Sequence, residues 1–356
     1  MAVAVETRPR GVALLLASPG RAVAFTMLAG AAIALQSYIN GRLGGEVGSP
    51  TIPAAINNLV ASVVTLAIVL ATRALPRARD RLRARGGAPP WFFLGGLGGA
   101  ALVLVSAAAA PELGVALLTV ALVCGSTGGS LPVDAAGLGP SGRRPVTLPR
   151  VVGVLLAVAA TVISARGSRG DPDVLLLALA FTAGLCMSLQ AAANGRLVRA
   201  TGEPWAASLV NVTVGLGALG LVALVTLATT PLDAMPGNPL LYVGGLLGAF
   251  VVVVTATAVQ TLGVLRLGLA MVAGQTTGAL IVDLIAPAPG ERVTAATVAG
   301  VVLTLVAVSV SERGQRTADA ADAGEDAPAV VGSTRAGTTT AGGAAPLPAP
   351  SPEASR

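Results

Sequence analysis

Apolar runs of about twenty residues recur along this chain between residues 22 and 311, separated by short polar connections. A helix needs roughly twenty apolar residues to cross the hydrocarbon core of a bilayer. Hydrophobic residues make up 54% of the 356 positions and charged residues 11%, whereas soluble domains carry about 25% charged residues. The chain therefore lacks the charge to cover a globular surface in water, and we expect an all-α membrane protein.

The apolar runs predict ten transmembrane helices, at about residues 22–40, 52–72, 91–110, 113–133, 150–165, 173–193, 205–229, 240–262, 264–286 and 293–311. The fourth and ninth are the least clearly separated from the helices before them. Residues 1–21 are predicted to be a cytoplasmic arm, because Ser18-Pro19-Gly20-Arg21 interrupts their short apolar run. Residues 312–356 have no apolar period and predict a disordered cytoplasmic tail.

Several classes of function lack the residues and motifs that they require. The chain has no His, and its two cysteines, Cys124 and Cys186, lie inside predicted helices, so we expect no metal site, cofactor or disulfide framework. No basic face interleaved with aromatic residues indicates a nucleic-acid partner. Without a P-loop or a nucleophile beside a base, the chain is not expected to be an enzyme.

The arginines predict the orientation, because cytoplasmic loops of membrane proteins are enriched in basic residues. A cytoplasmic N-terminus places fifteen arginines inside before the tail and four outside. Six of those inside lie in one loop, between Arg73 and Arg85, which we interpret as a cytoplasmic retention signal; an anionic-lipid or partner site is the alternative. We therefore expect a multi-pass protein of the bacterial cytoplasmic (inner) membrane with both termini in the cytoplasm.

An internal repeat is the most informative pattern in the sequence. Residues 35–43 read LQSYINGRL and residues 189–197 read LQAAANGRL, an offset of 154 that becomes 149 after a shorter loop in the second half. Further matched pairs are Gly48 and Gly202, Pro50 and Pro204, Asn57 and Asn211, Gly95 and Gly244, Gly125 and Gly274, Gly129 and Gly278, and Asp134 and Asp283. Polar matches in register are difficult to obtain by chance from an Ala/Val/Leu background.

The repeat predicts two five-helix units, residues 22–165 and 166–311. Because each unit has an odd number of spans, the second enters the membrane from the opposite side, and such inverted repeats are typical of transporters that work by alternating access. A duplicated scaffold that transports nothing is the alternative.

These motifs resemble those of the YdcZ family of inner-membrane exporters, in the drug/metabolite transporter superfamily with the EamA-like proteins. The resemblance rests on LQxxxNGRL, the following Gly-x-Pro, the Asn of the next helix and a late GQ…D segment, and covers about residues 22–311. It implies a transporter-like fold. Units of this family commonly hold five helices, so the chain looks like a fused pair. Ser126 stands where the second half has Gln275, so the two halves are not chemically equivalent.

Amides inside the predicted helices are candidates for a polar substrate path, because an amide in a membrane needs a partner or a wet cavity. The candidates are Gln36, Asn40, Asn57, Gln190, Asn194, Asn211 and Gln275. Interhelical hydrogen bonds that serve packing alone are an equally good explanation. The Asn-Gly pairs at 40–41 and 194–195 also predict helix C-termini, where Gly takes the left-handed conformation.

Two arginines and two aspartates are candidates for gating or proton coupling. Inversion would place Arg42 near Asp283 at the outer surface and Arg196 near Asp134 at the inner one. We hypothesise two ion pairs, each of which closes one end of the path. The alternatives are arginines that reach the interface beyond a helix end and aspartates at the interface without partners.

The chain is thus predicted to be a secondary transporter, and an exporter of a small organic metabolite or drug. A membrane scaffold or assembly subunit is the alternative from another class, and a channel is a third. Four Gly-xxx-Gly pairs, which begin at Gly95, Gly125, Gly244 and Gly274, allow close helix packing and would also suit a homodimer. Besides its substrate, the lipid bilayer is the expected partner.

Overall fold

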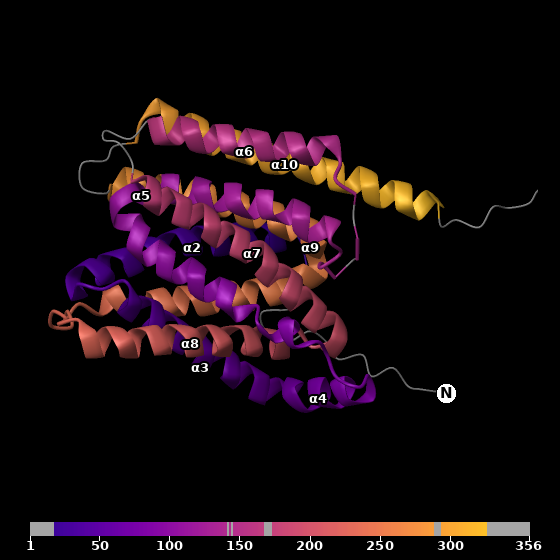
Figure 1. The fold of residues 1–356 in the computed structure, drawn as a ribbon, viewed down its shortest axis with the longest axis horizontal. Coiled ribbons are helices and arrows are strands. Elements are labelled where there is room, and N and C mark those ends of the chain that lie inside the picture. Colours follow the sequence, from indigo (N-terminus) through magenta and orange to yellow (C-terminus); the bar gives the residue numbers. More distant parts are fainter. Residues whose placement is uncertain (1–17, 141, 144, 167–172, 288–292, 326–356) are drawn as a thin grey trace, which may run out of the picture.

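The computed structural model describes residues 18–140, 142–143, 145–166, 173–287 and 293–325. Within these ranges the secondary structure is helical and no strand occurs (Figure 1). Among the described residues, seven helical stretches are long and apolar enough to cross a membrane, and two shorter apolar stretches occur at Pro239–Thr255 and Ala295–Ser311. The predicted class, an all-α membrane protein, is confirmed. Most of the predicted N-terminal arm, residues 1–17, lies outside the described residues.

The helices follow one another closely along the chain. They are α2 (Pro19–Val47), α3 (Thr51–Thr72), α4 (Ala74–Ala84), η1 (Pro90–Phe93), α5 (Gly96–Ala135), α6 (Leu148–Arg166), α7 (Val174–Thr201), α8 (Pro204–Thr229), η2 (Pro239–Tyr242), α9 (Gly244–Ile285) and α10 (Ala295–Glu325).

Helix α5 is a hairpin of two helical arms. Its 40 residues would extend about 60 Å if straight, roughly twice the hydrocarbon core of a bilayer. Gly114 interrupts it with φ 73° and ψ 160°, a conformation open to glycine. Residues 95–99 approach residues 190–194 of α7 in antiparallel order, whereas residues 125–129 approach residues 181–188 in parallel order. The chain therefore reverses at Gly114, between the predicted third and fourth spans.

Helix α9 reverses in the same way against α2. Residues 244–248 approach residues 36–40 in antiparallel order, and residues 274–278 approach residues 27–31 in parallel order. With both arms of α5 and of α9 counted separately, the described residues contain the ten apolar helical segments that the sequence predicts.

The long N-terminal helices of the two halves end later than predicted. The Asn-Gly pairs lie inside α2 and α7, and these helices continue to Val47 and Thr201. The left-handed residues that end them are Gly48 (φ 74°) and Gly202 (φ 62°). Each is followed two positions later by a proline, which caps α3 at Pro50 and begins α8 at Pro204, so the turn between the helices is formed by the Gly-x-Pro motif.

The first part of the predicted disordered tail, residues 312–325, is helical. Helix α10 continues to Glu325, and residues 312–325 include four Ala, two Glu and two Arg, which favour helix even without an apolar face. Residues 326–356 of the predicted tail lie outside the described residues.

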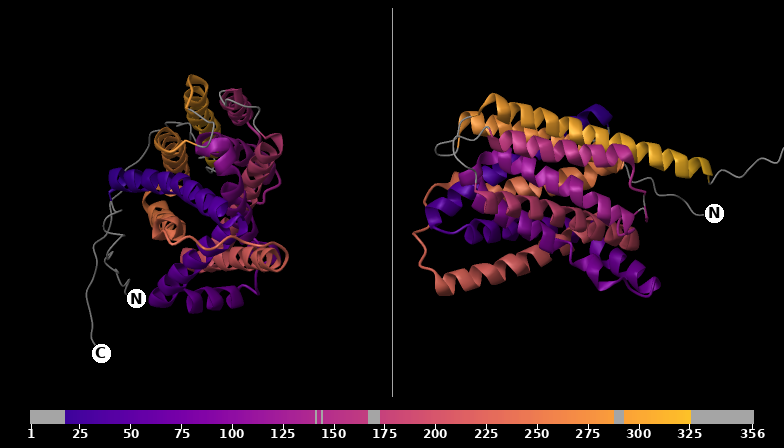
Figure 2. Two further views of the ribbon diagram at one scale, coloured as in Figure 1. Left: turned by 90° about the vertical axis from the view of Figure 1, so that its left-hand side faces the viewer. Right: turned by 45° about the horizontal axis from the view of Figure 1, so that its top comes forward.

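The most extensive helix contacts join the first half of the chain to the second. Helix α2 packs against α9, α5 against α7, α6 against α10, and α3 against α8. Helices α6 and α10 form a layer at one side of the bundle, and α3 and α8 lie at the opposite side (Figures 1 and 2). Each half thus packs largely against the other.

Glycines bring the paired helices into backbone contact. A Cβ on Gly274 would collide with the carbonyl oxygen of Met27, and a Cβ on Gly125 would collide with that of Phe181. These two contacts are equivalent under the repeat, since Met27 and Phe181 are matching positions on α2 and α7. Only glycine permits this approach, so the packing role predicted for these glycines is what the contacts require.

We predict that Gly274→Ala and Gly125→Ala destabilise the protein by about 1–3 kcal/mol, because the added methyl meets a rigid carbonyl. This cost exceeds the gain of about 1 kcal/mol from the better helix propensity of Ala. Thermal unfolding in detergent measures the difference. Gly217→Ala and Gly220→Ala on α8 are matched controls, since a Cβ at either position would have no atom within 4 Å, and they should not lower the melting temperature.

Candidate functional site

Three amides of the first half form one buried cluster, which we name the first amide cluster: Gln36, Asn40 and Asn57. Gln36 Nε2 on α2 donates a hydrogen bond of 2.8 Å to Asn57 Oδ1 on α3. The three side chains are 9%, 3% and 4% exposed. Two glycines of α9 complete the cluster, since Gly244 lies against Asn40 Oδ1 and Gly248 lies beside Gln36 Nε2.

Their counterparts in the second half form the second amide cluster: Gln190, Asn194 and Asn211. Gln190 Nε2 on α7 donates to Asn211 Oδ1 on α8 over 3.4 Å. Gly95 lies against Asn194 Oδ1 and Gly99 of α5 lies beside Gln190 Nε2. Residues that match in the sequence therefore make matching contacts, and each amide cluster is closed by glycines from the other half of the chain.

The two clusters differ in their access to open space. The second amide cluster is half-buried, and Gln190 lines a pocket of about 460 Å³ between α5 and α7. The other lining residues are mostly apolar and include Trp91, Leu97, Leu138 and Cys186. The first amide cluster is fully buried and its hydrogen bond is shorter. One polar cluster is thus closed while its counterpart lies at the wall of a pocket.

Gln275 is also buried, at 5% exposure, but it lies on the second arm of α9 and makes no hydrogen bond to either cluster. At the matching position of α5, Ser126 Oγ donates to the carbonyl oxygen of Val123 at 3.1 Å. The difference between the halves that the sequence indicates is therefore present in the packing.

Asp283 caps the second arm of α5. Its Oδ1 accepts the backbone N–H of Val115 at 2.8 Å, and its Oδ2 accepts that of Ala116 at 2.7 Å. The reversal at Gly114 removes the helical partners of these two N–H groups, and the partial positive charge of a helix N-terminus favours a carboxylate there. The carboxylate of α9 thereby holds the hairpin turn of α5.

Arg42 lies near Asp283 without forming the predicted pair. Both line a pocket of about 290 Å³ at the end of the bundle where α5 reverses at Gly114, together with Tyr38 and Pro111. Arg42 is largely exposed, and its guanidinium lies 3.8 Å from Glu46 and 3.5 Å from the Tyr38 hydroxyl. The Arg42–Asp283 pair is not formed in this structure, where the carboxylate of Asp283 accepts the N–H groups that the reversal at Gly114 leaves without helical partners.

The predicted pair of Arg196 with Asp134 is also absent. Asp134 Oδ2 lies 2.6 Å from a guanidinium nitrogen of Arg150, whose side chain is 2% exposed. Arg196 instead donates to the carbonyl oxygens of Gly137 (2.5 Å) and Leu138 (3.1 Å), which follow the end of α5. Both predicted partners thus lie at the same end of the bundle, but a nearer arginine takes the carboxylate.

Arg150 is the residue that reasoning from the sequence misses. The sequence places it among the loop arginines, yet it is the largest side chain that is almost fully buried. Gly153 of α6 and Gly300 of α10 make reciprocal contacts, so the position that matches Arg150 in the second half is Thr297, and Asp283 has no equivalent arginine. The pattern that could have indicated the pair is an Asp at one helix end and an Arg at the start of the next helix.

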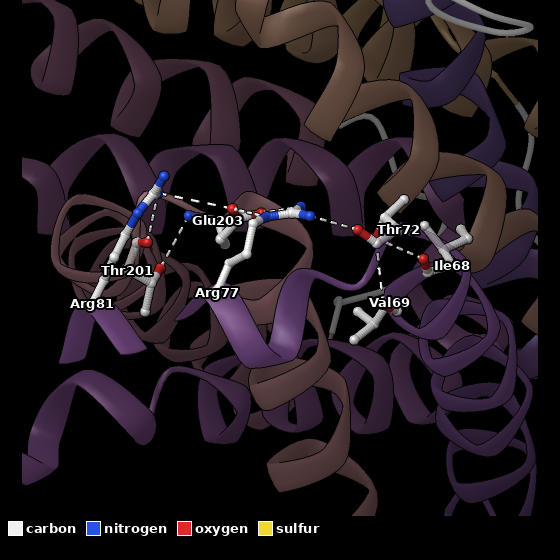
Figure 3. A network of polar contacts seen from close by, with 7 residues as sticks. All are labelled: Ile68, Val69, Thr72, Arg77, Arg81, Thr201 and Glu203. Atoms are coloured by element: carbon white, nitrogen blue, oxygen red, sulfur yellow. Dashed lines mark hydrogen bonds and ion pairs between the residues drawn. The ribbon is translucent and has the colours of Figure 1, made fainter. Parts of the chain in front are cut away.

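Helix α4 is fixed to the junction of α7 and α8 by a separate polar network (Figure 3). Arg77 binds Glu203 with two hydrogen bonds, of 2.7 and 3.0 Å. Arg81 donates to the carbonyl oxygen of Thr201 at 2.9 Å, and Arg85 donates to that of Arg199 at 3.1 Å. Three arginines spaced four residues apart thus place one face of α4 on this junction.

The Arg77–Glu203 pair shifts the titration of both groups. The hydrogen bond from Arg77 lowers the pKa of Glu203, and the hydrogen bond to Glu203 raises the pKa of Arg77. The matching position of Glu203 in the first half is Ser49. The network therefore belongs to one end of the bundle only, which we call the α4 end; the opposite end carries the Gly114 turn.

The described helices and the two matching amide clusters define a membrane protein with an internal repeat. The profile of the family described as "Putative inner membrane exporter, YdcZ", of the DMT type, matches the chain twice, at residues 21–163 and 175–310. The chain belongs to this family and carries two copies of its domain, as the sequence motifs predict. A search of curated proteins found no match.

We predict that Asp283→Ala destabilises the protein by about 1–3 kcal/mol, because two buried N–H groups lose their acceptor. Asp283→Asn should restore part of the loss, since one amide oxygen can still accept. The exchange Arg42→Asp with Asp283→Arg should be no more stable than Asp283→Arg alone. Thermal unfolding in detergent measures all four, and recovery by the exchange would contradict the capping role.

We also predict a pH dependence for the docking of α4. Because the pKa of Glu203 lies below its unfolded value of about 4.3, the ion pair contributes its full stability above that value. This contribution is lost as the pH falls through the folded pKa. The melting temperature of Glu203→Gln should therefore lie below that of the native protein at about pH 6–8, and converge with it in acid. Asp80→Asn, an exposed change on α4, is the control; an equal difference at all pH values would contradict the assignment.

Proposed function

We propose that the chain is a secondary transporter that exports a small organic compound by alternating access between two inverted repeats. The equivalence of the two amide clusters carries this proposal. Each cluster combines two helices of one copy with a glycine-bearing arm of the other, so a movement between the copies alters both clusters at once.

The inversion is supported by the number of apolar segments. Each matched region holds five, so the second copy starts from the opposite side of the bilayer. The first amide cluster lies towards the Gly114 end, since the neighbouring Gly41 packs on Pro111, whereas the second lies towards the α4 end. The arginines of α4 favour a cytoplasmic position for that end and for both termini.

The unequal access of the clusters supports a conformation that is open on one side. The pocket beside Gln190 has the volume of a small-molecule site, and its lining is mostly apolar. A compound with an apolar body and one or two hydrogen-bonding groups fits this lining. Arg42, Asp283, Arg196 and Asp134 lie at the two ends of the proposed path, where rearrangement of their partners would accompany opening.

Flux into proteoliposomes, measured with a panel of small amphipathic compounds, separates this function from the alternatives. Saturable flux that depends on a gradient supports the carrier. A linear dependence on concentration would indicate a channel, and absence of flux across the panel would favour a scaffold.

Reciprocal access of the two clusters is the prediction specific to alternating access. In a background of Cys124→Ser and Cys186→Ser, a disulfide between Gly244→Cys and Asn40→Cys, which lie in contact while the first amide cluster is closed, should hold that cluster closed. Labelling of Asn57→Cys by an impermeant maleimide from the Gly114 side should then fall several-fold, and labelling of Asn211→Cys from the α4 side should rise. Labelling that the disulfide changes at neither position would contradict the mechanism.

A further inference from the structure

Helix α4 presents two different arginine faces. Arg77, Arg81 and Arg85 bind oxygen atoms of residues 199–203. Arg79 and Arg83 lie on another face, are exposed, and make no hydrogen bond or ion pair within the described part of the chain. The first face holds α4 in place, so the second carries two arginines without partners among the described residues, on a helix whose position is fixed.

The free arginines border an apolar cleft of about 400 Å³ between α4, η1, α7 and α8. Its wall is formed by Leu75, Leu82, Phe93, Leu197, Ala206 and Val210, and it exposes almost no polar atom. Leu75 remains 48% exposed although it lies on a helix that is otherwise strongly charged. The cleft therefore combines an open apolar wall with two cations at its edge.

We propose that this cleft binds one anionic phospholipid of the leaflet that faces α4. The phosphate would lie between Arg79 and Arg83, and an acyl chain would lie along the apolar wall. Guanidinium groups bind phosphate with paired hydrogen bonds, and basic residues next to membrane spans attract anionic lipids. A soluble anion finds no polar partner inside the cleft, and a zwitterionic lipid supplies no net charge to the two arginines.

The site belongs to one copy of the repeat only. The connection between α8 and η2, residues 230–238, contains no helix and no arginine, so the second half has no equivalent of α4. A lipid bound at the cleft contacts both α4 and the α7 and α8 helices, and would stabilise the arrangement in which α4 is docked. The lipid site does not depend on the proposed transport function.

Native mass spectrometry of the full-length protein, with dioleoylphosphatidylglycerol or dioleoylphosphatidylcholine added in neutral detergent, tests the site. We expect one tightly retained phosphatidylglycerol per chain and no comparable retention of phosphatidylcholine. Arg79→Gln with Arg83→Gln should weaken this retention by about tenfold or more. Arg21→Gln with Arg266→Gln removes the same charge from exposed positions outside the cleft and should leave retention unchanged.

Two further measurements keep the outcomes distinct. Leu75→Gln should weaken phosphatidylglycerol retention without a change in net charge, and glycerol phosphate at millimolar concentration should not compete. Equal retention by the two double arginine variants, or full competition by glycerol phosphate, would overturn the lipid site.

Discussion

Close contact between the two copies of the repeat is the constraint on which the rest of the structure depends. The arms of α5 and α9 carry glycines that admit the backbone of α7 and α2, and the same arms close the amide clusters with Gly95 and Gly244. A hydrogen-bonded amide in an apolar bundle is stable only where its neighbours leave room and exclude lipid. The glycines thus determine both the packing and the position of the polar groups.

Differences between the two copies make the two ends of the bundle unequal. Asp283 is held by backbone N–H groups, whereas Asp134 is held by a buried arginine. Glu203 fixes α4 at one end, where the first half has a serine. Interactions of unequal strength at the two ends would make one open state more populated than the other.

The sequence predicts the class of fold, the ten helical segments and the matching of the polar residues. These features follow from the length of the apolar runs and from the internal repeat, neither of which depends on how the helices pack. The partners of the charged residues could not be predicted in this way. Asp283 binds N–H groups that are exposed only because Gly114 reverses the chain, and Asp134 binds an arginine near enough to exclude Arg196. Such competition depends on distances that a repeat alignment does not contain.

Alternating access requires the two copies to exchange open and closed conformations, and distances across the two ends of the bundle test this most directly. Spin labels on Gly45 and Pro287 span the pocket at the Gly114 end, and labels on Leu138 and Ala192 span the α4 end. Double electron–electron resonance in nanodiscs should give two distances for each pair, and a condition that lengthens one pair should shorten the other. A single unchanged distance at both ends, under all gradients and compounds tested, would contradict alternating access.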